Sequence, residues 1–220
     1  VITRTWRATD VAGNFSECIQ TITVHDVTAP VIACPAAITI NCEDSNLPAA
    51  TGTATATDNC APSGNITITS SDVSTQSADP STVLHYNYVI TRTWRATDVA
   101  GNFSECDQII TVHDVTKPVF TVPATVTVCR ASDCSYLSNI DPSLTGDVTD
   151  ESDNCTPGSL LNANYTDDFS GLVDCDNSGF IVRTWTLTDI TGNSTVKFQT
   201  IWVEPTPQAT IVTTTPIVCD

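Results

Sequence analysis

The 220-residue chain has no methionine, three histidines and only eight lysines and arginines. It contains neither G-x-S-x-G nor H-E-x-x-H, the signatures of many serine hydrolases and zinc proteases. It also lacks a C-x-x-C pair of the kind found in zinc sites, and it has no apolar stretch long enough to span a membrane. These absences argue against a catalytic site and against membrane insertion of this segment. We therefore expect a protein that is not an enzyme.

Acidic residues dominate the charge: 25 Asp and Glu give a formal net charge of −17. Such a chain would be repelled by nucleic acid and by anionic membrane surfaces, so we expect neither as a partner. The ten cysteines are typical of an oxidising compartment. Together these features predict a secreted or cell-surface protein.

The sequence repeats itself. Val1–Cys18 is identical to Val89–Cys106, and a divergent third copy spans roughly Ile181–Val203. A repeat of about 90 residues is a small domain, longer than the roughly 20–50 residues of a solenoid unit. We predict four segments: the C-terminal hairpin of a preceding domain (1–27), two complete domains (28–115 and 116–205) and the first strand of a following domain (206–220).

Short stretches rich in β-branched and aromatic residues alternate with turn signals, which predicts an all-β fold of tandem Ig-like β-sandwich domains arranged as a rod. We expect Val31–Cys42 to form the first strand of a complete domain. Between the two hairpin copies, Ile19 becomes Asp107 and Thr21 becomes Ile109, while the alternate positions do not change. This period of two indicates one packed face and one free face.

Four cysteines of the first complete domain (Cys34, Cys42, Cys60 and Cys106) allow three pairings. The second domain has Val122 in place of Cys34, and Thr195 or Val196 near the position of Cys106. Because these two cysteines are lost together, we expect them to be partners.

The remaining pairings follow by elimination and equivalence. We expect Cys42–Cys60 in the first domain and Cys129–Cys155 in the second, which leaves Cys134–Cys175 as a local addition. Cys18 and Cys219 would then have partners outside this sequence.

Three motifs resemble a known family: D-x-T-A-P-x-I-x-C-P at Asp26–Pro35, T-D-N-C at Thr57–Cys60 and R-T-W-x-A-T-D-x-A-G-N at Arg92–Asn102. They resemble the hyalin-repeat (HYR-like) branch of Ig-like domains, and the tandem form is similar to the long secreted adhesins of Bacteroidetes, including gliding-motility adhesins. The resemblance implies an extracellular repeat protein with an adhesive or filament-forming use. The signature positions are Arg92, Trp94, Asp98, Gly101 and Asn102.

Calcium is the sharpest chemical hypothesis, although no cofactor is required by the sequence. Asp26 and Asp114 lie in the joints between domains, Asp10 and Asp98 begin hairpin turns, and Asp58 lies in a cysteine loop that we expect at the same domain end. Ca²⁺ takes six to eight oxygen ligands, which such a cluster would supply. The alternative is that each Asp caps its own turn through an Asx-type hydrogen bond.

An arginine stands two residues before a tryptophan in all three copies, as in Arg92 and Trp94. Such a pair is suited to anchoring a ligand. The alternative is an arginine stem packed along the tryptophan, with its guanidinium paired to a nearby carboxylate.

We expect a structural and adhesive segment that gives reach and multivalent contact. Its partners would be neighbouring domains of the same long chain and surface polysaccharide or other cells. One alternative is a carbohydrate-binding or accessory module of a large secreted enzyme, which exposed aromatics on one sheet face would favour. Another is a filament subunit assembled by strand donation.

Overall fold

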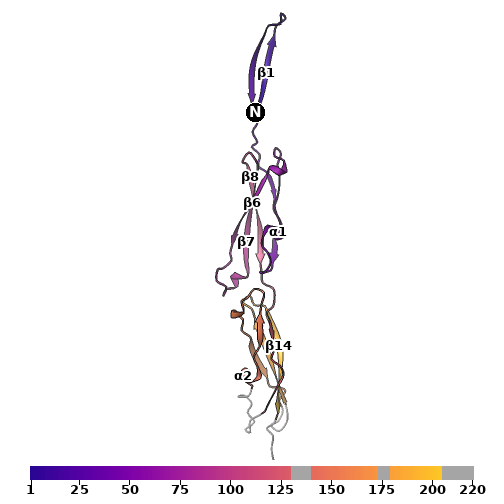
Figure 1. The fold of residues 1–220 in the computed structure, drawn as a ribbon, viewed down its shortest axis with the longest axis vertical. Helices are drawn as coiled ribbons and strands as arrows, with labels where there is room; N and C mark the ends of the chain where they lie inside the picture. Colours follow the sequence, from indigo (N-terminus) through magenta and orange to yellow (C-terminus); the bar gives the residue numbers. More distant parts are fainter. Residues whose placement is uncertain (130–139, 173–178, 205–220) are drawn as a thin grey trace, which may run out of the picture. The chain divides into compact units, whose positions relative to one another are not determined.

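The computed structural model describes residues 1–129, 140–172 and 179–204 (Figure 1). The predicted all-β class is confirmed. The described α-helices are single turns, α1 (Pro48–Thr51) and α2 (Pro142–Thr145), and each starts with proline at its first turn. The other elements are strands and short 3-10 turns.

The strands fall into one isolated hairpin and two similar sets. The hairpin is β1 (Ile2–Thr9) and β2 (Phe15–Ile22). The first set is β3 (Val31–Ala33), β4 (Ile38–Ile40), β5 (Thr55–Thr57), β6 (Thr67–Ser74), β7 (Tyr88–Thr97) and β8 (Phe103–Val112). The second set is β9 (Val119–Thr121), β10 (Val126–Cys129), β11 (Thr149–Ser152), β12 (Asn164–Asp168), β13 (Gly179–Thr188) and β14 (Ser194–Glu204).

Each set forms a four-stranded and a two-stranded sheet. The orders are β4-β8-β7-β6 with β3-β5 in the first set, and β10-β14-β13-β12 with β11-β9 in the second. The pairs β4–β8 and β10–β14 are parallel, and the remaining pairs are antiparallel. The two sets therefore have the same topology.

The predicted first strand over Val31–Cys42 is wrong, because this segment forms two short strands in different sheets. Proline at position 35 has no backbone N–H and cannot continue a ladder, so the chain leaves the β3–β5 sheet there. It then joins the other sheet as β4, beside β8.

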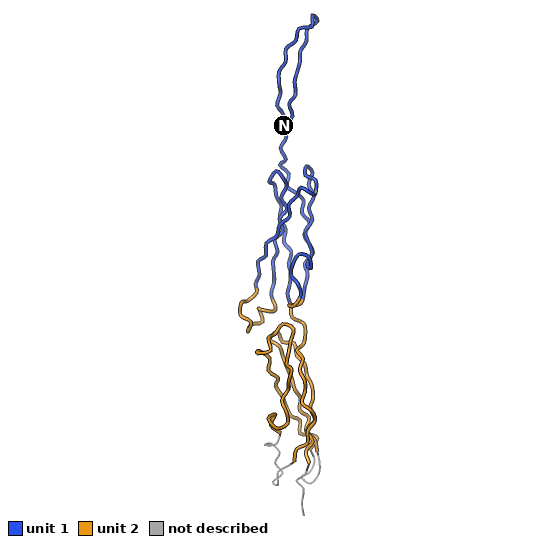
Figure 2. The backbone as a smooth tube through the Cα atoms, viewed as in Figure 1, with its two compact units in different colours: residues 1–40, 44–75, 88–112 blue, residues 41–43, 76–87, 113–220 orange. Residues whose placement is uncertain are grey.

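The chain divides into two compact units (Figure 2). Unit 1 contains residues 1–40, 44–75 and 88–112, and unit 2 contains 41–43, 76–87 and 113–220. Unit 2 therefore includes two short segments of the first repeat, and its boundary does not follow the predicted domain limits. Those limits stay a prediction.

Burial confirms the predicted alternation in the central hairpin. On β7, Ile90, Arg92, Trp94 and Ala96 are all buried, and the residues between them face outward. The corresponding core in unit 2 gathers Trp185 and Leu187 with Phe120 and Leu161, drawing residues from both sheets of that set.

The hairpin β1–β2 has the same sequence pattern without this cover. Within the described residues it pairs only with itself, and Trp6 is 54% exposed whereas Trp94 is 3% exposed. The same tryptophan is thus a core residue or a surface residue according to whether the other strands of its repeat are present.

Candidate functional site

The arginine of the repeat signature is a buried structural residue. Arg92 donates from Nε and Nη2 to the two carboxylate oxygens of Asp72, at 2.7 and 2.8 Å, and from Nη1 to Oγ1 of Thr51 at 2.9 Å. Its guanidinium lies 5.9 Å from the ring of Trp94, whose indole N–H donates to Gln108. This is the stem-and-carboxylate arrangement, so Arg92 is not free to anchor a ligand.

Unit 2 repeats the same network. Arg183 donates to both oxygens of Asp167, at 2.7 and 2.9 Å, and to Oγ1 of Thr145 at 2.8 Å. Its side chain is 1% exposed, and that of Asp167 is 9% exposed. Trp185 donates to Gln199, as Trp94 does to Gln108.

In both complete repeats, the hairpin turn after the signature strand is hydrogen-bonded to the interdomain joint that precedes the repeat. Asp98 accepts from the backbone N–H and the side-chain amide of Asn102, both at 2.9 Å. The same amide donates to the backbone carbonyl of Asp26 at 3.2 Å. Gly101 has φ of +92°, a conformation that side chains disfavour. The turn aspartates therefore do act as caps, as the simpler interpretation expected.

The turns also bring carboxylates together. In unit 1, one oxygen from each of Asp26, Asp58 and Asp98 lies within 4.8 Å of the others. Asp58 uses Oδ1 to accept from the N–H groups of Cys60 and Ala61. Its Oδ2 is buried and has no hydrogen-bond partner among the described residues.

Unit 2 contains an equivalent cluster of Asp114, Asp153 and Asp189, again with the ligand oxygens within 4.8 Å. The Oδ2 of Asp153 is likewise buried without a partner among the described residues. Thr191 adds a hydroxyl whose oxygen lies 3.1 Å from Asp114 and 2.8 Å from Asp189, so its single proton can be donated to either carboxylate. The sequence predicted that these loops meet, and each cluster combines a joint, a cysteine loop and a hairpin turn.

The cluster in unit 2 is electrostatically strained. Burial raises the pKa of Asp114 above its ordinary value, and the nearby charges of Asp153 and Asp189 add to the rise. Hydrogen bonds from Thr116 and Thr191 oppose it. Two unit charges at such separations repel by on the order of 3 kcal/mol at an effective dielectric constant of about 20. A divalent cation would remove this repulsion and would satisfy the orphaned oxygen.

Asp10, the fifth residue predicted as a metal ligand, is not brought into either cluster. It caps its own exposed turn, where the side chain and backbone of Asn14 lower its pKa. Among the described residues, none of the groups of three or more potential metal ligands includes Asp10. Asp10 therefore shows the turn motif without the rest of the cluster.

The predicted pairing of Cys34 with Cys106 is present, with Cα atoms 6.0 Å apart. The strand register corrects the expected replacement in the second repeat. Trp94 pairs with Cys106 and Trp185 pairs with Lys197, so Lys197 takes the place of Cys106 instead of Thr195 or Val196. Lys197 donates to the backbone carbonyl of Phe120, which ties β14 to β9 without a disulfide.

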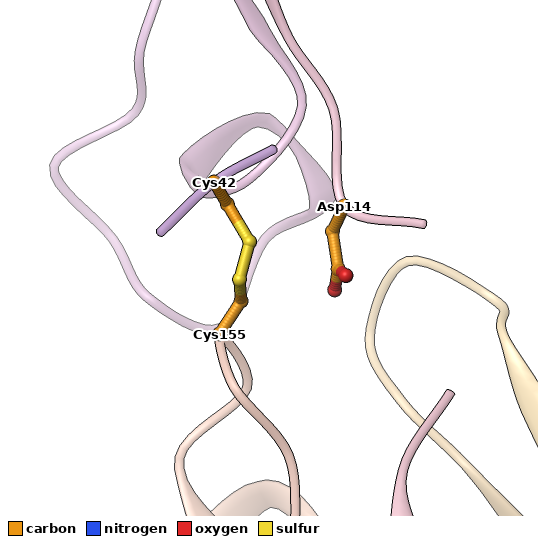
Figure 3. Close-up of side chains that lie close together, drawn as sticks. All are labelled: Cys42, Asp114 and Cys155. Carbon is orange, nitrogen blue, oxygen red and sulfur yellow. A yellow bond between two sulfur atoms is a disulfide. The ribbon is translucent and has the colours of Figure 1, made fainter. Parts of the chain in front are cut away.

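The predicted pairings Cys42–Cys60 and Cys129–Cys155 are wrong. Unit 2 contains a disulfide between Cys42 and Cys155, whose Cα atoms lie 6.2 Å apart, with Asp114 beside it (Figure 3). Cys18 and Cys60 are exposed and carry no disulfide in the described part of the chain. Cys134 and Cys175, predicted as a pair, lie outside the described residues, as does Cys219.

The strand register explains the correction. Thr57 pairs with Val31, so the loop with Cys60 lies beyond the starting end of β3, whereas Cys42 follows β4 at the finishing end of β8. A disulfide needs Cα atoms about 4.4–6.8 Å apart, and Cys42 meets this condition with Cys155, at 6.2 Å.

The outer face of the four-stranded sheet in unit 2 carries exposed aromatic side chains. Phe198 and Trp202 on β14 are 66% and 46% exposed, and Phe180 on β13 is 38% exposed. Phe180 and Trp202 are paired across the strands, with ring centroids 5.7 Å apart. The matching positions of the first repeat are Val89, Asp107 and Thr111.

The residues that complete the arginine networks could not be recognised from the sequence. Asp72 and Asp167 look like ordinary polar residues of an outer strand, and Thr51 and Thr145 lie in single-turn helices with no long-range signal. The one available clue was the placement of each threonine shortly before a glycine, Gly52 and Gly146, in both repeats.

No family model matches the chain, and no curated protein matches it. Solved structures similar to it include Drosophila N-cadherin EC1-4, at 14% identity and a TM-score of 0.32 over 80% of this chain and 50% of that chain. Human protocadherin-24 EC1-2 has 15% identity and a TM-score of 0.33, over 82% and 100% of the two chains. Protocadherin Gamma B2 domains 3-6 have 13% identity and a TM-score of 0.38, over 94% and 58%.

The chain spans about half the length of the N-cadherin fragment. Because these TM-scores are low, the fold assignment rests on the strand pairing described above. The narrower resemblance to hyalin repeats stays a prediction. Among the described residues, no helix has the length and apolar character needed to cross a bilayer.

Proposed function

We propose that this chain is a structural and adhesive segment of a longer extracellular protein, with no catalytic role. The observation that carries the proposal is repetition: both repeats have the same sheets, the same arginine network and the same carboxylate cluster. Disulfides support an oxidising, extracellular setting. Function spread over equal units favours reach and many weak contacts over one deep site.

Beads that carry the 220-residue chain at increasing density test the adhesive role. We expect their retention on bacterial or polysaccharide-coated surfaces to rise more steeply than linearly with density, while the free chain at micromolar concentration competes poorly. Tight binding by the single free chain would contradict multivalency. No retention at any density would contradict adhesion.

The carboxylate clusters supply the finer part of the proposal, that each repeat binds a calcium ion at its leading end. In unit 2 the ion would be held by Asp114, Asp153 and Asp189, with nearby carbonyl and water oxygens completing its ligands. The support is the buried Oδ2 of Asp153, which has no hydrogen-bond partner in the described part of the chain, and Asp58 matches it in unit 1. The ion would neutralise the repulsion that raises the pKa of Asp114.

Calorimetric titration with Ca²⁺ tests this part, with thermal unfolding in parallel. We expect two sites in the wild-type chain and one after Asp153→Asn. Asp10→Asn is the matched control, because Asp10 has the same turn motif but no cluster, so both sites should persist. No binding heat and no thermal shift at millimolar Ca²⁺ would contradict the calcium proposal while leaving the adhesive one standing.

The aromatic face of unit 2 favours a second candidate function, a carbohydrate-binding surface. Phe198 and Trp202 lie four residues apart on β14 and therefore on the same face, with Phe180 beside Trp202. Exposed aromatic rings can stack on the apolar faces of sugar rings. Three such rings on one face form a contiguous apolar patch, which is typical of an interaction site. This would place a carbohydrate-binding role in one repeat only.

Pull-down on insoluble polysaccharides separates the two candidates. We expect Trp202→Ala and Phe198→Ala to weaken binding by tenfold or more, a loss of about 1.4 kcal/mol or greater each. Thr111→Ala and Asp107→Ala, at the matching positions of the first repeat, are the controls and should have no effect. Equal binding by all four variants would exclude this face.

A further inference from the structure

The bond between Cys42 and Cys155 joins two different repeats of the sequence. Cys42 lies in the repeat 28–115, two residues after β4, and Cys155 lies in the Asp-Asn-Cys loop of the following repeat. The repeat therefore has two cysteine positions with different roles. The first position, that of Cys42, lies at the C-terminal end of β4 and bonds to the following repeat. The second position, that of Cys155, lies in the Asp-Asn-Cys loop and bonds to the preceding repeat.

Cys60 occupies, in the first complete repeat, the position that Cys155 has in the second. It stands in the same Asp-Asn-Cys sequence as Cys155, and the preceding aspartate caps both loops in the same way. The joint aspartate is also equivalent: Asp114 lies beside Cys155, and Asp26 lies beside Asp58, two residues before Cys60. Yet Cys60 is exposed and makes no disulfide within the described residues.

We propose that Cys60 is a cross-linking site for the cysteine that follows the second strand of another repeat of this type, at the position that Cys42 has after β4, so that the two repeats are joined by a disulfide. The proposed bond is equivalent to the one between Cys42 and Cys155. The proposal does not depend on which surface or ligand the repeats bind.

The chemistry is an ordinary thiol oxidation. The two Sγ atoms lose two protons and two electrons as the S–S bond forms, and a disulfide-bearing oxidant of the extracellular compartment is reduced to its dithiol.

A second cysteine supports the same extension. Cys18 pairs in register with Trp6, as Cys106 does with Trp94, so Cys18 is the copy of a cysteine that bonds to Cys34. A repeat that is completed by the hairpin β1–β2 should therefore close two bonds, one to Cys18 within itself and one to Cys60 across the joint.

The test compares the 220-residue chain with a chain extended at its start by a copy of residues 28–88. Both are refolded with oxidised and reduced glutathione and labelled with iodoacetamide without reduction. In the 220-residue chain Cys18 and Cys60 should be labelled, and Cys155 should not. In the extended chain both Cys18 and Cys60 should be protected.

The control is the extended chain with Cys42→Ser in the added copy only. We expect Cys60 to be labelled again while Cys18, bonded within the added repeat, stays protected. Labelling of Cys60 in the parent extended chain, with Cys18 protected, would overturn the proposal. Protection of Cys60 in the 220-residue chain would overturn it as well, because Cys60 would then have another partner, and this arm does not depend on whether the added repeat folds.

Discussion

Asp167→Asn should be one of the most damaging single substitutions in unit 2. It removes the carboxylate that is hydrogen-bonded to the Arg183 guanidinium, whose other hydrogen bonds go to neutral oxygens of Thr145 and Ile140. Both partners are buried, with exposed fractions of 1% and 9%. Breaking a buried pair on one side costs about 3–5 kcal/mol, because the other charge is left uncompensated.

Asp72→Asn is the matched substitution in unit 1 and should cost less. Arg92 makes the same contacts, but the Asp72 side chain is 40% exposed. Water therefore screens the pair in the native state and can solvate the arginine after the change, which reduces the expected loss to about 1–2 kcal/mol. The difference between the two variants follows from exposure alone.

Hydrogen exchange in increasing urea, read by mass spectrometry, gives the stability of each unit separately. Peptides from β12 and β13 should lose protection in Asp167→Asn, and peptides from β6 and β7 should lose less in Asp72→Asn. Equal losses in the two variants would refute the argument from exposure. A loss below about 0.5 kcal/mol in Asp167→Asn would refute the structural role of the arginine itself.

Three further predictions concern the turns and the carboxylate cluster. Because burial raises the pKa of Asp114 in the fold, its ionised form destabilises unit 2 above that pKa. This group therefore adds stability as the pH falls from 7 towards its unfolded value of 3.8, whereas Asp141 and Asp168, whose pKa values are lowered, oppose the gain at the acid end. In chelator, Asp114→Asn should raise the thermal midpoint at pH 7, and its advantage over the wild type should shrink as the pH falls. Asn193→Ala removes the amide that bridges Asp189 and the carbonyl of Asp114, and should lower the free energy of unfolding in urea by about 1–2 kcal/mol. An unchanged free energy of unfolding would contradict a role for this amide in fixing the joint. Gly101→Ala should lower the free energy of unfolding by about 1 kcal/mol because of its positive φ alone. Gly146→Ala should lower it more, because the new Cβ would also lie 2.8 Å from Pro123, and equal shifts of the thermal midpoint would contradict this ranking.

Local pattern was sufficient to predict the strands of the central hairpin and their buried face. Two copies that differ only at alternate positions identify the free face, and Trp94 and Cys106 then fall on the packed one. The meeting of Asp26, Asp58 and Asp98 was also predictable, because a joint, a loop and a turn with recurring aspartates all lie at one end of a sandwich.

The partner of Cys42 could not be found in the same way. Elimination within one domain assumes that each domain closes its own bonds, and the strand register shows that Cys42 and Cys60 lie at opposite ends of the repeat. Two further features depend on which strands become neighbours: the split of the first strand at Pro35 and the pairing of Arg92 with Asp72. The period of the hydrophobic pattern does not predict the order of the strands in a sheet.

The intact mass of the native polypeptide, with disulfide mapping on the same sample, tests the central claim most directly. We predict a mass many times the 23.4 kDa of these 220 residues, with Cys42 bonded to Cys155 and Cys34 bonded to Cys106 in one continuous chain. A mass near 23.4 kDa, with cysteines bridging separate chains, would identify a polymerising subunit and contradict the account of a long chain of linked repeats.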